Sequence, residues 1–506
     1  MRWLIRAFGS LLAPTSKRFH RNLSQPQVTQ RELQQHLFTQ LVNGDYGRSL
    51  EINSINDWHQ IPIITYEDLH PWIQSRRSLT SESILFYEKT SGSSGPAKHI
   101  PYTRTLRKSF NTLFCIWAYD LIANGPRFDT GKVYMCISPK LLAPGETAEG
   151  LQDDSEYLDP WLRWLLKPFL VLPPDAHKPQ KPEAFQANLC KTLVLENNLE
   201  TISIWSPSFL TVQLDYIQAH RQELQTQLKG QLSPQRAELL NRSSIDWEAL
   251  WPKLKLISCW DSAMAADQVS GLQAQFPNTL IQGKGLLATE APMTVPLIEA
   301  NGCVPLINEV FFEFEDEAGE IYQLHELELG QTYSVIISQT GGLYRYRMGD
   351  LIQVTHYYRA TPCLKFLGRS NATSDLVGEK LTLAAVSQIF ETLNLPANAF
   401  KCLVPSLSPQ PQYRLLMDQA GPDNLADILE QLLCQNFHYR QARLLGQLQP
   451  VQVHSAPDML QRLMQYHYRQ GKRLGDVKYP YLLTMPIDDL DLANVEHAPF
   501  TQTGHC

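Results

Sequence analysis

The sequence predicts an α/β fold: a large N-terminal domain of layered α/β sheets with a β-rich part, followed by a smaller C-terminal α+β domain. Strand and helix patterns alternate between residues 132 and 283, and short alternating strands replace them after Asn301. A chain of 506 residues can bury more than one core. We place the domain boundary in the turn-rich stretch around Arg369, giving domains 1–368 and 369–506.

The alternating part supplies the predicted parallel sheet. A helix is expected over 103–123, where apolar residues recur at helical spacing. Buried strands are expected at 132–138, 201–206, 254–259 and 279–283. Further helices are expected to start at Pro207, a favoured first-turn residue, and to cover 263–275.

The β-rich part and the small domain follow. Alternating strands at 308–316, 320–327 and 332–338 predict a mixed or antiparallel sheet. The next strand alternates Arg345 and Arg347 with tyrosines, and we expect it to turn at Gly349 and present Asp350. Beyond Arg369 the predicted elements are helices at 382–393 and 425–434 and strands at 401–406, 413–418 and 451–455.

Composition excludes several classes of function. The net charge of −7 argues against general nucleic-acid binding, which needs a basic face. Nine scattered cysteines without a C-x-x-C pair suit free thiols in a reducing, cytoplasmic location. No stretch reads as membrane-spanning, so we expect no integral membrane association. The basic segment before Glu32 is either a retained amphipathic helix or a transit peptide.

The stretch "TSGSSGPAK" (90–98) is the strongest candidate for a phosphate-binding loop. It matches neither G-x-x-x-x-G-K-[ST] nor G-x-G-x-x-G. Its small residues expose backbone N–H groups and hydroxyls that can surround anionic oxygens, with Lys98 as a nearby charge. Taken alone, it reads equally well as a flexible Ser/Gly connector.

Two later stretches favour the phosphate reading. "LLATE" places Thr289 and Glu290 after a predicted strand, where α/β sheets bind ligands. "GLYRYRMGD" ends on Asp350. Together with "YGRSLEINSINDWHQIPIITYEDLHPWI" (46–73), these stretches resemble the auxin-responsive acyl acid–amido synthetases of the adenylate-forming, firefly-luciferase-like superfamily, as a bacterial or plastid-type member.

The resemblance implies ATP and Mg²⁺ as cofactors and assigns a role to each matching residue. The loop residues would hold the β- and γ-phosphates, with Lys98 in support; they are Thr90, Ser91, Gly92, Ser93, Ser94 and Gly95. Glu290 would hold Mg²⁺ and Thr289 would bond near the α-phosphate. Asp350 would accept bonds from the ribose hydroxyls, and Arg369 matches the superfamily's ribose-contacting, hinge-side arginine. Surface carboxylates and salt-bridged arginines are the structural alternatives.

The small domain is expected to add one catalytic cation. "GDVKYP" makes Lys478 the match to the family lysine that reaches the α-phosphate, with Lys472 as a rival. Leu286 stands where the superfamily often stacks an aromatic ring on adenine, so an apolar grip is expected instead. The acyl-binding helix of the family carries an arginine in several plant members; Arg104 and Arg107 lie at the start of the predicted helix, but neither lies in a local match to it, so the choice of acid stays open.

The implied reaction activates a carboxylic acid with ATP and transfers the acyl group to an amine acceptor, expected to be an amino acid. A rotation about 368–370 would exchange the two half-reactions. Transfer to a thiol, of coenzyme A or a carrier protein, is a second possibility, and a catalytically idle nucleotide-binding relative a third. No histidine in these motifs is an obvious general base.

Overall fold

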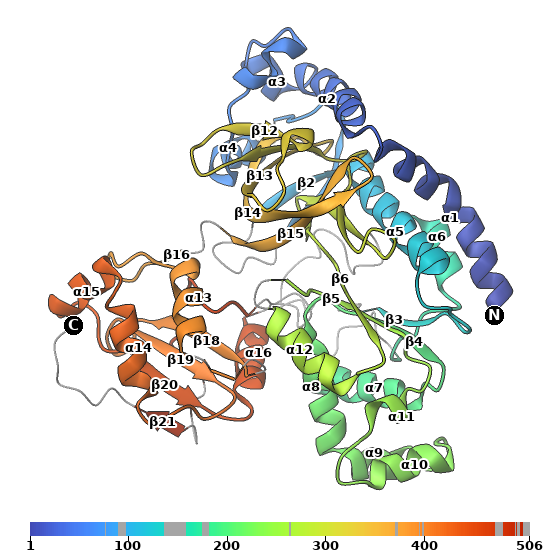
Figure 1. Cartoon of the computed structure of the whole chain (residues 1–506), viewed down its shortest axis with the longest axis vertical. Helices are drawn as coiled ribbons and strands as arrows, with labels where there is room; N and C mark the ends of the chain where they lie inside the picture. The colour runs from blue at the N-terminus through green and yellow to red at the C-terminus, as the bar shows by residue number, and fades with distance from the viewer. Residues whose placement is uncertain are drawn as a thin grey trace.

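The structure is a computed structural model (Figure 1). It describes residues 1–75, 77–89, 98–135, 158–174, 182–262, 265–369, 373–393, 395–396, 399–470, 479–490, 492 and 496–498.

A four-stranded parallel sheet forms the α/β layer, in the order β3–β4–β5–β6. Helices cover the sheet, so every residue of β4 and β5 is buried, including Glu200 in β4. The strands are β3 (Lys132–Met135), β4 (Leu199–Ser203), β5 (Leu256–Cys259) and β6 (Leu280–Gly283). The helices of this layer are α7 (Pro182–Leu195), α8 (Pro207–Ala219), α9 (Arg221–Gln227), α10 (Pro234–Asn241), α11 (Trp247–Leu250) and α12 (Ala265–Gln275).

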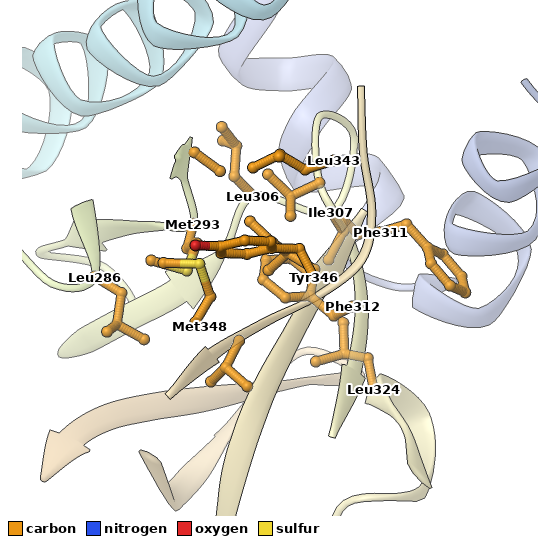
Figure 2. Packing of buried hydrophobic residues seen from close by; sticks show 14 of the residues in the cluster. Leu286, Met293, Leu306, Ile307, Phe311, Phe312, Leu324, Leu343, Tyr346 and Met348 are labelled. Atoms are coloured by element: carbon orange, nitrogen blue, oxygen red, sulfur yellow. The ribbon is translucent and has the colours of Figure 1, made fainter. Parts of the chain in front are cut away.

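A five-stranded antiparallel sheet forms the β-rich part, in the order β12–β11–β13–β14–β15. Its strands are β11 (Phe311–Glu315), β12 (Ile321–Gln323), β13 (Thr332–Gln339), β14 (Leu343–Tyr358) and β15 (Thr361–Arg369); the 3-10 turn η3 (Leu324–Glu326) follows β12. Figure 2 shows part of its core, where Tyr346 points toward Met293 and Met348. Three hairpins accompany this sheet: β1 (Ile84–Lys89) with β2 (His99–Thr103), β7 (Leu287–Ala288) with β8 (Ala291–Pro292), and β9 (Thr294–Leu297) with β10 (Gly302–Pro305).

The N-terminal helices wrap the outside of the β-rich part. The basic segment is helix α1, which packs against α5 (Figure 1). Gly9 permits this approach, because a Cβ there would lie 3.0 Å from a methyl carbon of Ile122. The helices are α1 (Arg2–Asn22), α2 (Pro26–Val42), α3 (Asp45–Ser49), η1 (Ile55–Gln60), α4 (Tyr66–Gln74), α5 (Arg104–Asn124) and α6 (Pro160–Leu166).

The C-terminal unit is a separate α+β layer, drawn orange to red in Figure 1. Its sheet has the order β18–β19–β20–β21, in which only β19 and β20 are parallel. The strands are β16 (Thr373–Ser374), β17 (Leu381–Thr382), β18 (Lys401–Ser406), β19 (Gln412–Met417), β20 (Gln452–Ser455) and β21 (Glu496–Ala498). The helices are α13 (Leu383–Thr392), α14 (Leu425–Leu433), α15 (Phe437–Leu444) and α16 (Met459–Arg469).

The predicted fold class is confirmed, with two local corrections. The chain does not turn at Gly349. That glycine has a φ of 75° and lies inside the 16-residue strand β14, where the pairing with β13 shifts register. A positive-φ glycine in a paired strand makes a bulge, which lets the strand continue. The predicted strand at 320–327 is shorter, because η3 replaces its second half.

Two expectations from composition have structural answers. None of the helices that the structure describes is long and apolar enough to span a bilayer. Cysteines 115, 190, 259, 303, 363 and 402 are free thiols, whereas Cys434 is disulfide-bonded. The expectation of free thiols was therefore wrong at Cys434, because scattered spacing in the sequence does not exclude a disulfide.

Candidate active site

Thr289 and Glu290 lie at the tip of the β7–β8 hairpin, after the last strand of the parallel sheet. The backbone of this tip is fixed from two sides. The Tyr102 hydroxyl donates to the carbonyl of Thr289 at 2.7 Å, and the Gln339 amide donates to the carbonyl of Glu290 at 3.1 Å. Strands β2 and β13 therefore hold the turn that carries both predicted residues.

The Glu290 side chain is buried among charges from distant parts of the chain. The residue is only 5% exposed. Burial raises the pKa of its carboxyl above the usual range; Arg369 and Lys98 oppose that rise, and Asp350 adds to it. Four residues predicted separately from the sequence thus interact electrostatically in one place.

Asp350 and Arg369 face each other across the β14–β15 ladder. The Arg369 Nε donates to Asp350 Oδ1 at 2.9 Å. The Asp350 side chain is 6% exposed, whereas that of Arg369 is 39% exposed. Asp350 raises the pKa of the Arg369 guanidinium, which therefore stays charged. An ionised carboxylate has about four acceptor positions, so one bond from Arg369 leaves room for a pair of hydroxyl donors.

Lys98 lies against two tyrosines. Its ammonium donates to the Tyr346 hydroxyl at 3.3 Å and lies 5.5 Å from the ring centre of Tyr66 and 5.9 Å from that of Tyr346. Burial raises the pKa of the Tyr346 hydroxyl, and the charge on Glu290 adds to the rise. The tyrosine therefore stays neutral, and its hydroxyl oxygen can accept the hydrogen bond from the lysine ammonium.

The arginines of "YRYRMGD" connect this strand to the motif at 46–73. Arg345 Nε donates to Glu313 at 3.0 Å, and its Nη1 donates to the carbonyls of His59 and Ile61 at 2.8 and 2.7 Å. The backbone of Ile64 pairs in parallel with β14, donating to the Arg345 carbonyl and accepting from the Arg347 N–H. The two motifs are thus neighbours in space.

Leu286 is a core residue. It is 5% exposed, and its backbone N–H donates to the Thr294 hydroxyl at 2.7 Å. Figure 2 shows it near Met348 at the edge of the hydrophobic cluster. The apolar contact of Leu286 with adenine stays a prediction.

Several predicted residues lie outside the described part of the chain. These are the whole phosphate loop Thr90–Gly95, both candidate lysines, Lys472 and Lys478, and Ser370 at the proposed hinge. The described part therefore brings together Lys98, Thr289, Glu290, Asp350 and Arg369, and their catalytic and binding roles stay predictions.

The chemistry of these residues fits Mg²⁺ that arrives with a nucleotide. Among the described residues, no group of three or more His, Cys, Asp or Glu side chains could hold a metal by itself. Mg²⁺ commonly takes one or two carboxylates and completes its shell with phosphate oxygens and water. Glu290, with Asp350 close enough to influence it, satisfies that requirement.

A second cluster, which the sequence reasoning missed, lies at the carboxyl edge of the parallel sheet. The Lys284 ammonium donates to the Ser203 hydroxyl at 2.8 Å and lies 5.1 Å from the ring of Trp205 and 5.8 Å from the ring of Trp117. The rings of Trp205 and Trp260 are 5.8 Å apart. The available signal was Trp205 inside the predicted strand 201–206 and Trp260 directly after the predicted strand 254–259.

Comparison with known families accounts for most of the chain. Residues 15–281 match the GH3 family N-terminal domain, residues 303–369 the GH3 family central domain, and residues 380–486 the GH3 family C-terminal domain. Among curated relatives, the indole-3-acetic acid-amido synthetase GH3.8 of Oryza sativa subsp. indica is 22% identical over 84% of this chain and 82% of its own length. The 4-substituted benzoates-glutamate ligase GH3.12 of Arabidopsis thaliana is 36% identical, over 16% of each chain.

Two solved structures share the fold. The GH3.15 acyl acid amido synthetase matches with a TM-score of 0.72 at 18% identity, covering 92% of this chain and 93% of its own. A 2-hydroxyisobutyryl-CoA ligase in complex with 2-HIB-AMP matches with a TM-score of 0.56 at 12% identity, covering 92% and 89%. The chain thus has the architecture of adenylate-forming ligases.

Proposed function

Because the chain belongs to the GH3 family, we propose that it is an ATP-dependent acyl acid–amido synthetase. In the first half-reaction a carboxylate oxygen of the acid attacks the α-phosphorus of ATP, and the bond to pyrophosphate breaks. In the second an amine, an amino acid in this proposal, attacks the acyl carbon, loses a proton and displaces AMP. Family membership together with the cluster around Glu290 supports this proposal.

The cluster suits the first half-reaction because two anions must meet in it. Lys98 and Arg369 supply positive charge close to a buried carboxylate, and a buried environment strengthens each of these interactions. Glu290 would hold Mg²⁺, which neutralises phosphate charge when it is bound. Thr289, whose backbone is anchored by Tyr102, would bond near the α-phosphate.

Asp350 is the proposed ribose ligand. Its carboxylate is held by Arg369 at a strand-to-strand pair, so it is oriented before the nucleotide arrives. The loop Thr90–Gly95 would hold the pyrophosphate that leaves, and Lys478 would reach the α-phosphate; both roles come from the family resemblance.

Several finer statements belong to the same proposal. The chain would divide at 368/369, and the C-terminal domain would rotate about 368–370 between the half-reactions. We also place the enzyme in the cytoplasm without nucleic-acid partners, as a bacterial or plastid-type member of the family.

Acid-dependent exchange of pyrophosphate into ATP tests the first half-reaction. We expect exchange with at least one acid from a panel of aromatic, indolic, jasmonate-like and fatty acids in the presence of Mg²⁺. Thermal stabilisation by ATP and Mg²⁺ should disappear in Glu290→Ala and Asp350→Ala. Stabilisation that persists in both variants would contradict the proposed site.

The acceptor is tested by adding amino acids or coenzyme A to a positive reaction. Amide formation with an amino acid, detected by mass spectrometry, is the expected result. A thioester with coenzyme A and no amide would overturn the assignment of an amine acceptor.

A further inference from the structure

The cluster of Lys284 and three tryptophans has the composition of a ligand pocket. Trp117 comes from α5, Trp205 follows β4 and Trp260 follows β5, and all three are partly exposed, as is Lys284. Small-molecule sites are mostly apolar and aromatic, with a few polar groups that fix orientation. In open α/β sheets such sites lie outside the carboxyl ends of the strands, and this cluster occupies that edge.

The direction of the Lys284 side chain identifies which part of a ligand it would meet. Lys284 follows β6, yet its ammonium reaches Ser203 at the end of β4, two strands away. Two strand spacings amount to roughly 10 Å. The side chain therefore crosses the end of β5 toward β4, whereas the chain itself continues from β6 into the β7–β8 hairpin, which carries Glu290.

The neighbours of Lys284 fix it in this direction. The Trp117 indole N–H donates to Gln282 at 2.9 Å, which orients the ring that lies beside the ammonium. The backbone N–H of Trp260 donates to the carbonyl of Trp205 at 2.8 Å, so the two strand ends stay together. An ordered cation between aromatic faces is preorganised to bind an anion that enters along those faces.

We propose that Lys284 is a specificity-determining residue, which binds a second carboxylate at the end of the acyl acid remote from the reacting carboxyl group. This inference rests on the proposed function, because it assumes that the reacting carboxyl group lies near Glu290. The tryptophans would contact the planar body of the acid. The substrate class is therefore a planar dicarboxylic acid.

The test compares matched acids that differ only in the second carboxylate, such as cinnamate with 4-carboxycinnamate and benzoate with terephthalate. For the unaltered enzyme we expect the KM in pyrophosphate exchange to be about 10- to 100-fold lower for the preferred diacid than for its monoacid, since a hydrogen bond to a charged group contributes on that scale. Lys284→Met should remove this difference while kcat and the KM for the monoacid stay within a few fold. Lys284→Arg should retain part of the preference.

Two controls separate this role from a structural one. Lys253→Met removes an exposed charge that donates to Asn198 at 2.6 Å, and it should leave the preference intact. If Lys284→Met does not fold, Lys284→Gln replaces it, and the diacid-to-monoacid ratio of KM remains the readout. A preference that survives loss of the charge overturns the inference, as does an enzyme that uses both members of every pair equally well.

Failure of the proposed function would look different. If the unaltered enzyme exchanges pyrophosphate with no acid, the diacid is titrated without ATP while tryptophan fluorescence is followed. Saturable quenching in the unaltered protein, with a Kd that rises at least tenfold in Lys284→Met, would support the site. The absence of Lys284-dependent binding would overturn it.

Discussion

Two of the arginine–carboxylate pairs on strand β14, at Arg345 and at Asp350, differ in exposure. Arg345 and Glu313 are 6% and 7% exposed, and further bonds from Arg345 reach two backbone carbonyls. In the pair of Asp350 and Arg369 the arginine is 39% exposed. The first pair is closed by the fold, and the second leaves access to solvent. The motif "YRYRMGD" thus combines a structural pair, at Arg345, with a pair at Asp350 that a ligand can reach.

Replacing Arg345 should give the largest effect. Arg345→Met leaves the Glu313 carboxylate buried without its charge partner, and removing one member of a buried pair costs about 3–5 kcal/mol. We expect the unfolding of the N-terminal part to move to a clearly lower Tm in calorimetry.

Arg347→Met is the matched control. Arg347 binds Glu315 through two bonds of 3.1 and 2.5 Å, but these side chains are 33% and 20% exposed, so water can solvate the remaining carboxylate. Its effect on Tm should be several times smaller. Equal losses of Tm from both substitutions would show that burial of the Arg345–Glu313 pair does not increase its contribution to stability.

Asp350→Asn should change binding more than stability. The substitution keeps the shape but weakens the acceptor for two hydroxyl donors, so we expect affinity for ATP to fall about 10- to 100-fold in calorimetric titration. The Tm without nucleotide should change little, because Arg369 remains partly solvated. Glu317→Gln, an exposed carboxamide substitution in the same region, serves as the control. A large loss of Tm with normal ATP affinity would show that Asp350 has a structural role and does not bind the nucleotide.

The smallest effect concerns the proton on Glu290. Because burial raises the pKa of its carboxyl, the free protein holds a proton there to higher pH than an exposed glutamate does. Binding of Mg²⁺ and ATP should release it, so affinity should rise as pH increases through that raised pKa. Titration calorimetry in buffers of different ionisation heat measures the release, which should be a fraction of one proton and should vanish in Glu290→Gln. Release that is unchanged in the variant would assign the proton to another group.

Local patterns predicted all strands of the parallel sheet and most strands of the five-stranded and C-terminal sheets, but fewer than half of the helices. Helix α5 was expected at 103–123 and spans Arg104–Asn124, and β18 has both predicted ends. The bulge at Gly349 was predicted as a turn, because a single sequence shows that the glycine can adopt a positive φ but does not show the partner strand that keeps β14 extended.

The candidate site was predictable as a set of motifs but not as a set of contacts. The sequence identified Lys98, Glu290 and Asp350 from their strings. It did not show that Lys98 lies against Tyr346, because that contact joins residues 248 positions apart. Lys284 was missed for the same reason, because its proposed role depends on contacts with Trp117 and Trp205, which come from other elements.

The bond between Arg345 and the carbonyl of Ile61 has a consequence for synthesis on the ribosome. The two residues are 284 positions apart. At about 5–20 residues per second, roughly 15 to 60 s pass between the synthesis of Ile61 and that of its partner. Trp58 and Ile61 are buried in the finished protein and cannot reach β14 before then. Nascent chains therefore expose this apolar stretch for most of their synthesis, and pausing in the middle of the message would lengthen that exposure.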